Sequence, residues 1–230
     1  MSQEQRLRAI AEELQQDRGQ LLRPSRGVAQ SDVYLVDIDG QKAIIKDFSS
    51  RPFLSRHLPC RLIIQRELSV LHDLRDTGRV PKVYGQLSPF SFALEYLEGE
   101  SPGRHNAGQW PDAFQKTADF LDDMHNRGFA HNDFRRDNMM VMADGEVCFF
   151  DFAAALRKPQ KYRLLFFPLT LLVNFMQWMD QIGLLKMKPD LTGQPLTADE
   201  KKRSEKPLIV RGLRDFWKHY INKPLLHRLK

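Results

Sequence analysis

Residues 128–152, GFAHNDFRRDNMMVMADGEVCFFDF, place charged and amide side chains directly beside the apolar runs MMVM and VCFF. Ala143-Asp144-Gly145 between the two runs predicts a short hairpin. Burying polar groups is costly unless they are paired or bind a ligand. Asp133, Asn138 and Asp151 lie next to these apolar runs, so a functional site explains them better than chance.

The composition favours a folded globular protein. The chain has 230 residues, of which 42% are hydrophobic and 28% charged, enough to bury the core of one or two lobes. Cys60 and Cys148 are far apart and belong to no Cys/His cluster, so neither a disulfide framework nor a zinc site is expected. The net charge of +6 favours an acidic partner, whether nucleotide phosphates, nucleic acid or an anionic membrane.

The sequence contains no predicted export signal or membrane span. Residues 3–17 have the polar, amphipathic pattern of a helix and lack the apolar core of a signal peptide. The longest apolar run, residues 164–175, is shorter than the roughly 20 residues that cross a bilayer, and Pro168 interrupts it. We therefore expect a cytoplasmic protein.

The order of predicted elements divides the chain into two parts. Residues 31–38 and 41–48 predict a hairpin with its turn at Asp39-Gly40, and residues 60–78 predict a helix that stops at Gly78. A second strand pair follows at 82–87 and 90–97, and residues 98–111 have the composition of a linker. A helix is predicted over 113–127, and further helices from 162 onward with a polar break at 189–198. We expect lobes at residues 1–97 and 98–230.

The spacing of the polar residues carries a resemblance. His131-x-Asp133-x-x-x-x-Asn138 is followed, thirteen residues after the asparagine, by Asp151-Phe152. Upstream, AIIK ends at Lys46 on a predicted strand, Glu67 lies on the next helix, and LEYLEG resembles a hinge. This ordered set, over roughly residues 25–155, resembles the protein kinase-like superfamily. The resemblance implies an α+β fold of two lobes, a small β-rich N-lobe and a mainly helical C-lobe.

The resemblance also implies roles in ATP- and Mg²⁺-dependent phosphoryl transfer. Asp133 would be the catalytic base, and Arg135 would neutralise the transferring phosphate. Asn138 and Asp151 would bind magnesium, since this ion prefers hard oxygen ligands. The phosphates would be held by the lysine of a strand-to-helix ion pair, Lys46 with Glu67.

Adenine would bind between the lobes. The resemblance implies backbone hydrogen bonds from Glu95 and Leu97, and apolar walls formed by Val33, Ile44 and Met140. We expect His131 to be a structural residue that braces the catalytic loop. Asp137 and Asp144 are expected to serve as capping or turn residues without a catalytic role.

The chain departs from a regulated eukaryotic kinase in three ways. Only Gly27 stands where a GxGxxG loop is expected, Asp151-Phe152-Ala153 replaces DFG, and no APE motif or activation segment follows. These departures make the chain more similar to bacterial lipopolysaccharide-core kinases of the Kdo/WaaP type and to RIO-like atypical kinases.

Three functions stay open at this point. The first is phosphorylation of a sugar hydroxyl on a lipopolysaccharide-type glycolipid. The second is a RIO-like protein serine kinase, and the third is a pseudokinase that only binds a partner. The basic and apolar residues of 157–188 leave open a peripheral position on the inner membrane. No nucleic-acid module is found, so no nucleic acid partner is expected.

Overall fold

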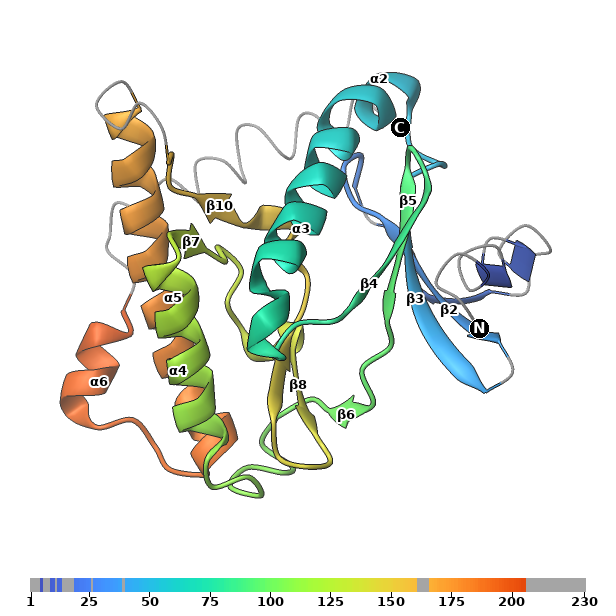
Figure 1. The fold of residues 1–230 in the computed structure, drawn as a ribbon. Coiled ribbons are helices and arrows are strands. Elements are labelled where there is room, and N and C mark those ends of the chain that lie inside the picture. The colour runs from blue at the N-terminus through green and yellow to red at the C-terminus, as the bar shows by residue number, and fades with distance from the viewer. Residues whose placement is uncertain are drawn as a thin grey trace.

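A computed structural model describes Gln5, Ala9–Ile10, Glu12–Glu13 and residues 19–25, 27–38, 40–160 and 166–205. Most of the helix predicted over 3–17, and the basic tail from 206 onward, lie outside these residues. The five described residues near the N-terminus include the fully buried Ile10, which packs on one face of a β-sheet. Figure 1 shows this sheet on one side of the molecule and a group of helices on the other.

The sheet has five antiparallel strands in the order β1-β2-β3-β5-β4. Its strands are β1 (Gln20–Arg23), β2 (Asp32–Ile38), β3 (Gln41–Asp47), β4 (Val83–Ser88) and β5 (Ser91–Glu95). The predicted hairpin turns at Gly40, whose φ of +81° favours glycine. The central position of β3 sets Lys46 opposite Val33 on one side and Phe92 on the other. Strand β1 was not predicted.

A long helix crosses the sheet beside the helical part of the chain (Figure 1). Two short turns, α2 (Phe53–Ser55) and the π-helical η1 (Arg56–Cys60), lead into α3 (Arg61–Leu74). The buried side of α3 carries Ile64, Val70, Leu71 and Leu74, together with one charged residue, Glu67. A 3-10 turn, η2 (Arg75–Thr77), ends the element at Gly78, which has the left-handed φ of +66°. The predicted helix and its stop are confirmed.

The second part of the chain is mainly helical. It contains α4 (Ala113–Asn126), the 26-residue α5 (Phe167–Thr192) and α6 (Ala198–Arg203). Pro168 lies at the first turn of α5, where proline is tolerated, and so it does not interrupt the helix. Among the described helices, none has the length and apolar content needed to cross a membrane.

Short strands position the predicted site residues between these helices and the sheet. β6 (Gly99–Glu100), β8 (Met139–Met142) and β9 (Val147–Phe149) form one small sheet, and β7 (Phe129–Ala130) pairs with β10 (Leu156–Arg157). The 3-10 turns η3 (Arg136–Asn138) and η4 (Phe152–Ala154) adjoin them. Since β6 pairs with β8, the start of the predicted linker is part of the helical lobe rather than a free connection.

One hydrophobic core runs from α3 into the helical lobe. Phe149 of β9 stacks on Phe120 of α4 and on Phe134, with ring centroids 4.8 Å apart in both pairs. Burying a side chain of this size contributes about 1.5–3 kcal/mol. The stack therefore fixes the loop between β7 and β8 against α4, and this loop carries the polar residues singled out in the sequence.

Candidate active site

Three charged residues predicted from separate motifs meet between the lobes. The Nζ atom of Lys46 on β3 lies 2.6 Å from Oε1 of Glu67 on α3 and 2.9 Å from Oδ1 of Asp151. Lys46 and Glu67 are buried, with side chains 7% and 1% exposed. A guanidinium nitrogen of Arg23 lies 3.5 Å from Oδ2 of Asp151. Arg23 was not predicted as a site residue, since nothing in its neighbourhood distinguishes it from other surface arginines.

Burial and charge act in opposite directions on these groups. Burial by itself would lower the pKa of Lys46, but the carboxylates of Glu67 and Asp151 raise it overall, so the lysine stays protonated. Burial by itself would raise the pKa of Asp151, but the charge of Lys46, their hydrogen bond and the charge of Arg23 lower it to about 2. Burial raises the pKa of Glu67 against the opposing effect of Lys46. We take Glu67 to be ionised at neutral pH because its oxygen lies 2.6 Å from a protonated amine.

An apolar cavity of about 250 Å³ opens beside the lysine. Its lining includes every residue predicted to surround adenine, namely Val33, Ile44, Glu95, Leu97 and Met140, together with Lys46 and Asp151. The amide of Glu95 already donates to the carbonyl oxygen of Lys82 over 2.9 Å. The amide of Glu95 therefore already has a partner within the protein.

The loop between β7 and β8 holds the remaining predicted residues. Asn138 is buried, and its Nδ2 atom donates to both the carbonyl oxygen and the Oδ2 atom of Asp133, each over 2.9 Å. The Nε atom of Arg135 lies 3.3 Å from Oδ1 of Asp133. Asp133 and Arg135 are 43% and 56% exposed, and both line a cavity of about 440 Å³ that also contains Lys46 and Asp151. The structure thus brings together all of the predicted polar site residues.

A residue that the sequence analysis missed supports this loop. Asp180 of α5 is buried, and its two carboxylate oxygens accept hydrogen bonds from the backbone amides of His131 (2.7 Å) and Asn132 (2.9 Å). Its Oδ2 atom also lies 3.3 Å from Nε2 of His125 on α4. The signal in the sequence was a single acidic residue within the apolar helix QWMDQIGLL. The close approach of α5 also depends on Gly183, where a Cβ atom would collide with the carbonyl oxygen of Phe134.

His131 braces the same loop from inside, in agreement with the architectural role predicted for it. It is fully buried, and its ring centroid lies 4.6 Å from that of Phe152 and 5.7 Å from that of Phe134. Burial lowers the pKa of His131, although the charge of Asp180 opposes this shift. The lowered pKa favours the neutral ring. The histidine therefore connects the Asp133 loop to the segment that follows Asp151.

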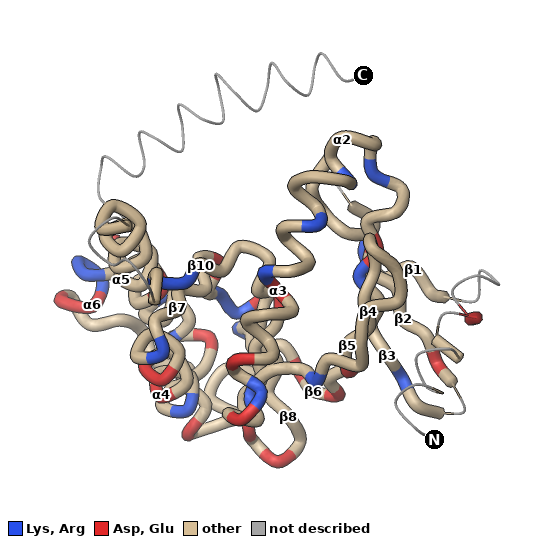
Figure 2. Tube along the Cα trace, turned by 45° about the horizontal axis from the view of Figure 1, so that its top comes forward, with Lys and Arg blue, Asp and Glu red and all other residues tan. Residues whose placement is uncertain are grey.

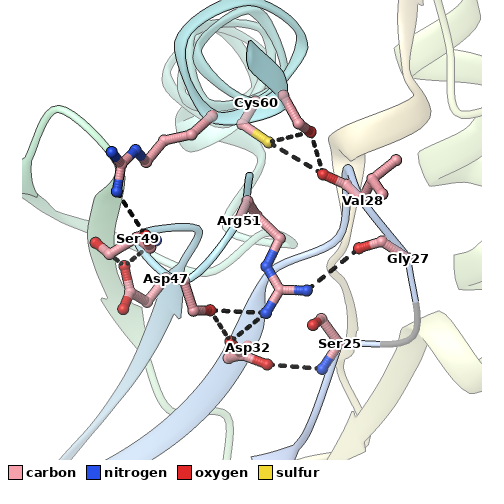
Figure 3. A network of polar contacts seen from close by, with 11 residues as sticks. Ser25, Gly27, Val28, Asp32, Asp47, Ser49, Arg51 and Cys60 are labelled. Atoms are coloured by element: carbon pink, nitrogen blue, oxygen red, sulfur yellow. Dashed lines mark hydrogen bonds and ion pairs between the residues drawn. The ribbon is translucent and has the colours of Figure 1, made fainter. Parts of the chain in front are cut away.

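The loop between β1 and β2 takes the place of the glycine-rich loop, and side chains anchor it (Figure 3). The amide of Ser25 donates to Oδ1 of Asp32 over 2.7 Å. Arg51 donates from one guanidinium nitrogen to Oδ2 of Asp32 (2.9 Å) and from the other to the carbonyl oxygen of Gly27 (3.4 Å). Ser55 and Cys60 both donate to the carbonyl oxygen of Val28. These bonds fix the loop without the glycines that the sequence lacks.

Comparison with known proteins agrees with this architecture. No protein-family model matches the chain. The solved Rio2 kinase–ADP/Mg²⁺–phosphoaspartate complex from Chaetomium thermophilum is similar in structure, with a TM-score of 0.53 and 16% sequence identity. The similarity covers 88% of this chain and 67% of that one. The chain has a protein kinase-like fold. The predicted two-lobed α+β fold class is thereby confirmed.

A curated sequence relative is also kinase-like. Half of the chain, 50%, is 24% identical to the serine/threonine-protein kinase PknD from Chlamydia pneumoniae. The chain spans only 14% of the length of that relative. Within the kinase-like fold, β3, α3, the β7–β8 loop and the segment after β9 are the elements that carry Lys46, Glu67, Asp133 and Asp151 here.

Proposed function

We propose that the chain is an ATP- and Mg²⁺-dependent phosphotransferase with an alcohol group as acceptor. The observation that carries the proposal is that Nζ of Lys46 lies within 2.9 Å of carboxylate oxygens of both Glu67 and Asp151 at the edge of an apolar cavity. Ionisable groups with shifted pKa values in a cleft are typical of functional sites. An inactive binding module would have no need to keep the buried lysine, the Asp133 carboxylate and Asn138 together.

In this proposal the nucleotide lies across the 250 Å³ cavity with its phosphates toward Lys46. Val33, Ile44 and Met140 would pack against adenine, while the Glu95 carbonyl and Leu97 amide would bind its polar edge. Arg23 lines both this cavity and the 440 Å³ cavity next to it, so we add it as a phosphate contact. We also propose the division of the chain into lobes at Leu97/Glu98, between the end of β5 and the start of β6.

The residues present fit a magnesium ion held jointly with the phosphates. Asp151, whose pKa is about 2, is an anionic oxygen ligand at neutral pH. The amide nitrogen of Asn138 is used by Asp133, which leaves its oxygen for a cation. Within the described part of the chain, no three His, Cys, Asp or Glu side chains form a group that could hold a metal ion by themselves. Magnesium does not require such a group, because in enzymes of this kind one or two side chains commonly bind it together with the phosphates. When bound, the ion would neutralise charge on the phosphate oxygens.

The reaction itself would depend on Asp133 and Arg135. Asp133 is 43% exposed toward the cleft and would accept the proton of the attacking hydroxyl. Asn138 fixes the orientation of this carboxylate through its 2.9 Å hydrogen bond. Arg135 would move its charge from Asp133 to the transferring phosphate, which explains its place in the cavity that contains Lys46 and Asp151.

For the acceptor we propose a sugar hydroxyl of a lipopolysaccharide-type glycolipid. A cavity of about 580 Å³ between the β7–β8 loop and α5 adjoins Asp133. Apolar Phe175 and Met179 line it together with Arg136, which is ion-paired with Asp190 over 2.7 Å. The apolar side chains suit an acceptor with an apolar part and the polar ones suit sugar hydroxyls, at the cytoplasmic face of the inner membrane. A RIO-like protein serine kinase is the second candidate, favoured by the similarity to the Rio2 kinase structure.

The test is transfer of label from γ-labelled ATP into fractionated cell extract. Label in the lipid fraction supports the glycolipid acceptor, and label in protein supports the second candidate. Asp133→Ala should keep nucleotide affinity nearly intact and lower turnover by about 10² or more, because it removes only the acid/base group. Asp151→Asn should weaken Mg-ATP binding in calorimetric titration. Nucleotide binding without any transfer by the unmodified protein would instead favour the pseudokinase.

A further inference from the structure

A stripe of exposed apolar side chains runs along the segment that leads into α3. Leu54, Leu58 and Leu62 are 75%, 64% and 60% exposed, and the neighbouring Phe53 is 67% exposed. The three leucines are spaced four residues apart, so they share one face of the continuous helical segment formed by α2, η1 and α3. Single exposed leucines need no explanation, but three on one face with an exposed phenylalanine beside them indicate a binding surface.

The stretch that carries this stripe is basic. Residues 48–66 contain four arginines and one histidine and no aspartate or glutamate, namely Arg51, Arg56, His57, Arg61 and Arg66. Arg51 is ion-paired with Asp32 outside the stretch, so the other arginines carry its surface charge. Arg61 and Arg66 are exposed. Apolar side chains among basic residues, without an acidic residue in the stretch, are the composition of segments that lie in the interface of an anionic membrane.

The segment is held firmly on the sheet. Arg56 donates to the carbonyl oxygen of Ser49 over 2.8 Å, and its guanidinium lies 5.0 Å from the ring centroid of Phe90. The ring of His57 lies between those of Phe53 (4.3 Å) and Phe90 (4.9 Å). These contacts use the inner side of the segment, so the leucine stripe is presented outward in a preformed arrangement that loses little entropy on binding.

A second exposed apolar group lies at the same end of the molecule. The first half of α5 exposes Phe167, Leu171, Leu172, Phe175 and Trp178, each between 39% and 54%. α2 and the first turns of α5 are both at the upper end of Figure 1, whereas the connection from β5 to β6 is at the opposite end. Figure 2, turned by 45°, shows α5 and α2 on opposite sides of α3. Phe175 also lines the cavity that adjoins Asp133.

We propose that these two groups form one surface that binds an anionic lipid bilayer, with the α2–η1–α3 stripe as the main contact. The basic, acid-free stretch selects an anionic partner, and the position of both groups at the same end of the molecule matches a flat partner that meets both lobes. Binding itself does not depend on the proposed phosphotransferase activity. Delivery of a lipid-borne acceptor to Asp133 does rest on that proposed function.

The experiment places a polarity-sensitive fluorophore on the stripe of the full chain. Leu54→Cys can be labelled selectively, because Cys60 and Cys148 are buried. Vesicles of phosphatidylcholine with phosphatidylglycerol should shift the emission of this label to the blue, and vesicles of phosphatidylcholine alone should not. A label at Lys82→Cys, whose native side chain is 79% exposed and ion-paired with Glu95 at the end of β5, should not respond. No ATP is added, so failure of the kinase proposal cannot affect the result.

Co-sedimentation with the same vesicles separates the apolar and charged contributions. Leu58→Ser/Leu62→Ser and Arg61→Glu should each weaken anionic-vesicle binding about tenfold or more, since both apolar insertion and a basic charge near the membrane surface are favourable. Leu21→Ser on β1 and Lys201→Glu on α6 are the matched controls and should bind like the unmodified protein. Vesicle binding with an unresponsive label at position 54 overturns the proposal, as does a concentration-dependent dimer in gel filtration that the serine variants abolish.

Discussion

Replacing Asp180 with asparagine tests whether the β7–β8 loop, which carries the proposed base Asp133, is held by a charge on α5. Both oxygens of Asp180 accept backbone hydrogen bonds, from His131 at 2.7 Å and from Asn132 at 2.9 Å. A hydrogen bond to a charged group contributes about 1.5–3 kcal/mol, and a neutral one about 0.5–1.5 kcal/mol. Asparagine has a single acceptor oxygen, so one of the two bonds becomes a neutral one and the other is lost, because its NH2 group would face a backbone N–H. Together these changes predict a loss of about 2.5–4.5 kcal/mol in the free energy of unfolding. For a chain of this size, that lowers Tm by roughly 5–18 °C.

The kinetic part of the same prediction separates positioning from simple destabilisation. Asp133 is two residues from His131, so a loosened loop should lower kcat at least about tenfold while KM for ATP changes little, because the adenine cavity lies elsewhere. Thermal unfolding and initial rates, measured well below Tm, supply both numbers. Asp122→Asn is the matched control, since this exposed residue accepts one hydrogen bond from Gln181 that an amide can also accept. Unchanged kcat in a destabilised Asp180→Asn protein would refute the positioning role.

Three further variants test other parts of the site. Lys46→Met should destabilise the protein by about 3–5 kcal/mol, since it leaves Glu67 buried without its partner. In denaturant unfolding, the double variant Lys46→Met/Glu67→Leu should recover this stability, but it should not recover activity. Gly183→Ala should lower both Tm and kcat, because the added Cβ collides with the carbonyl oxygen of Phe134. In a helix with free space at this position the same change would stabilise the protein by about 0.5–1 kcal/mol, so a stabilised variant would contradict the close contact of α5 with Phe134. Arg51→Lys should raise KM for ATP several-fold with little change in kcat, since a lysine cannot bind Asp32 and the Gly27 carbonyl with two nitrogens at once. An unchanged KM would show that the β1–β2 loop does not contribute to nucleotide binding.

The sequence predicted those elements whose signals are local. The β2–β3 hairpin follows from alternation around Gly40, and α3 follows from periodicity that stops at Gly78. The polar site residues could be predicted because their spacing along the chain is itself specific. Their mutual contacts depend on the packing of α3 against β3, and no local pattern measures that. The prediction was therefore strongest for which residues matter and weakest for what supports them.

The contacts that could not be predicted join residues that are far apart in the sequence. Asp180 binds amides 48 and 49 residues earlier in the chain. The anchor of the β1–β2 loop joins Asp32 to Arg51, two residues that look like ordinary surface charges in the sequence. Residues 98–111 have a linker composition, yet their first strand pairs with β8, because backbone pairing at β6 needs no apolar side chain. Two of these three contacts have a backbone group as the partner, and sequence patterns describe side chains; the third joins side chains 19 residues apart.

Backbone conformation explains why the segments around Asn132 and Asp151 need such support. Among the described residues other than glycine, only Asn132 and Asp151 have left-handed φ angles, of 65° and 67°. Both are of the residue types that tolerate this region best, but each still costs free energy that the surroundings must offset. At Asn132 the carboxylate of Asp180 binds the amide, and at Asp151 the side chain is bound by Lys46 and Arg23. The ionic contacts around the site therefore hold the backbone turns that direct Asp133 and Asp151 into the cleft, as well as balancing charge. Removing one such contact should first change the geometry of the loop and thereby lower turnover, before the protein loses its fold.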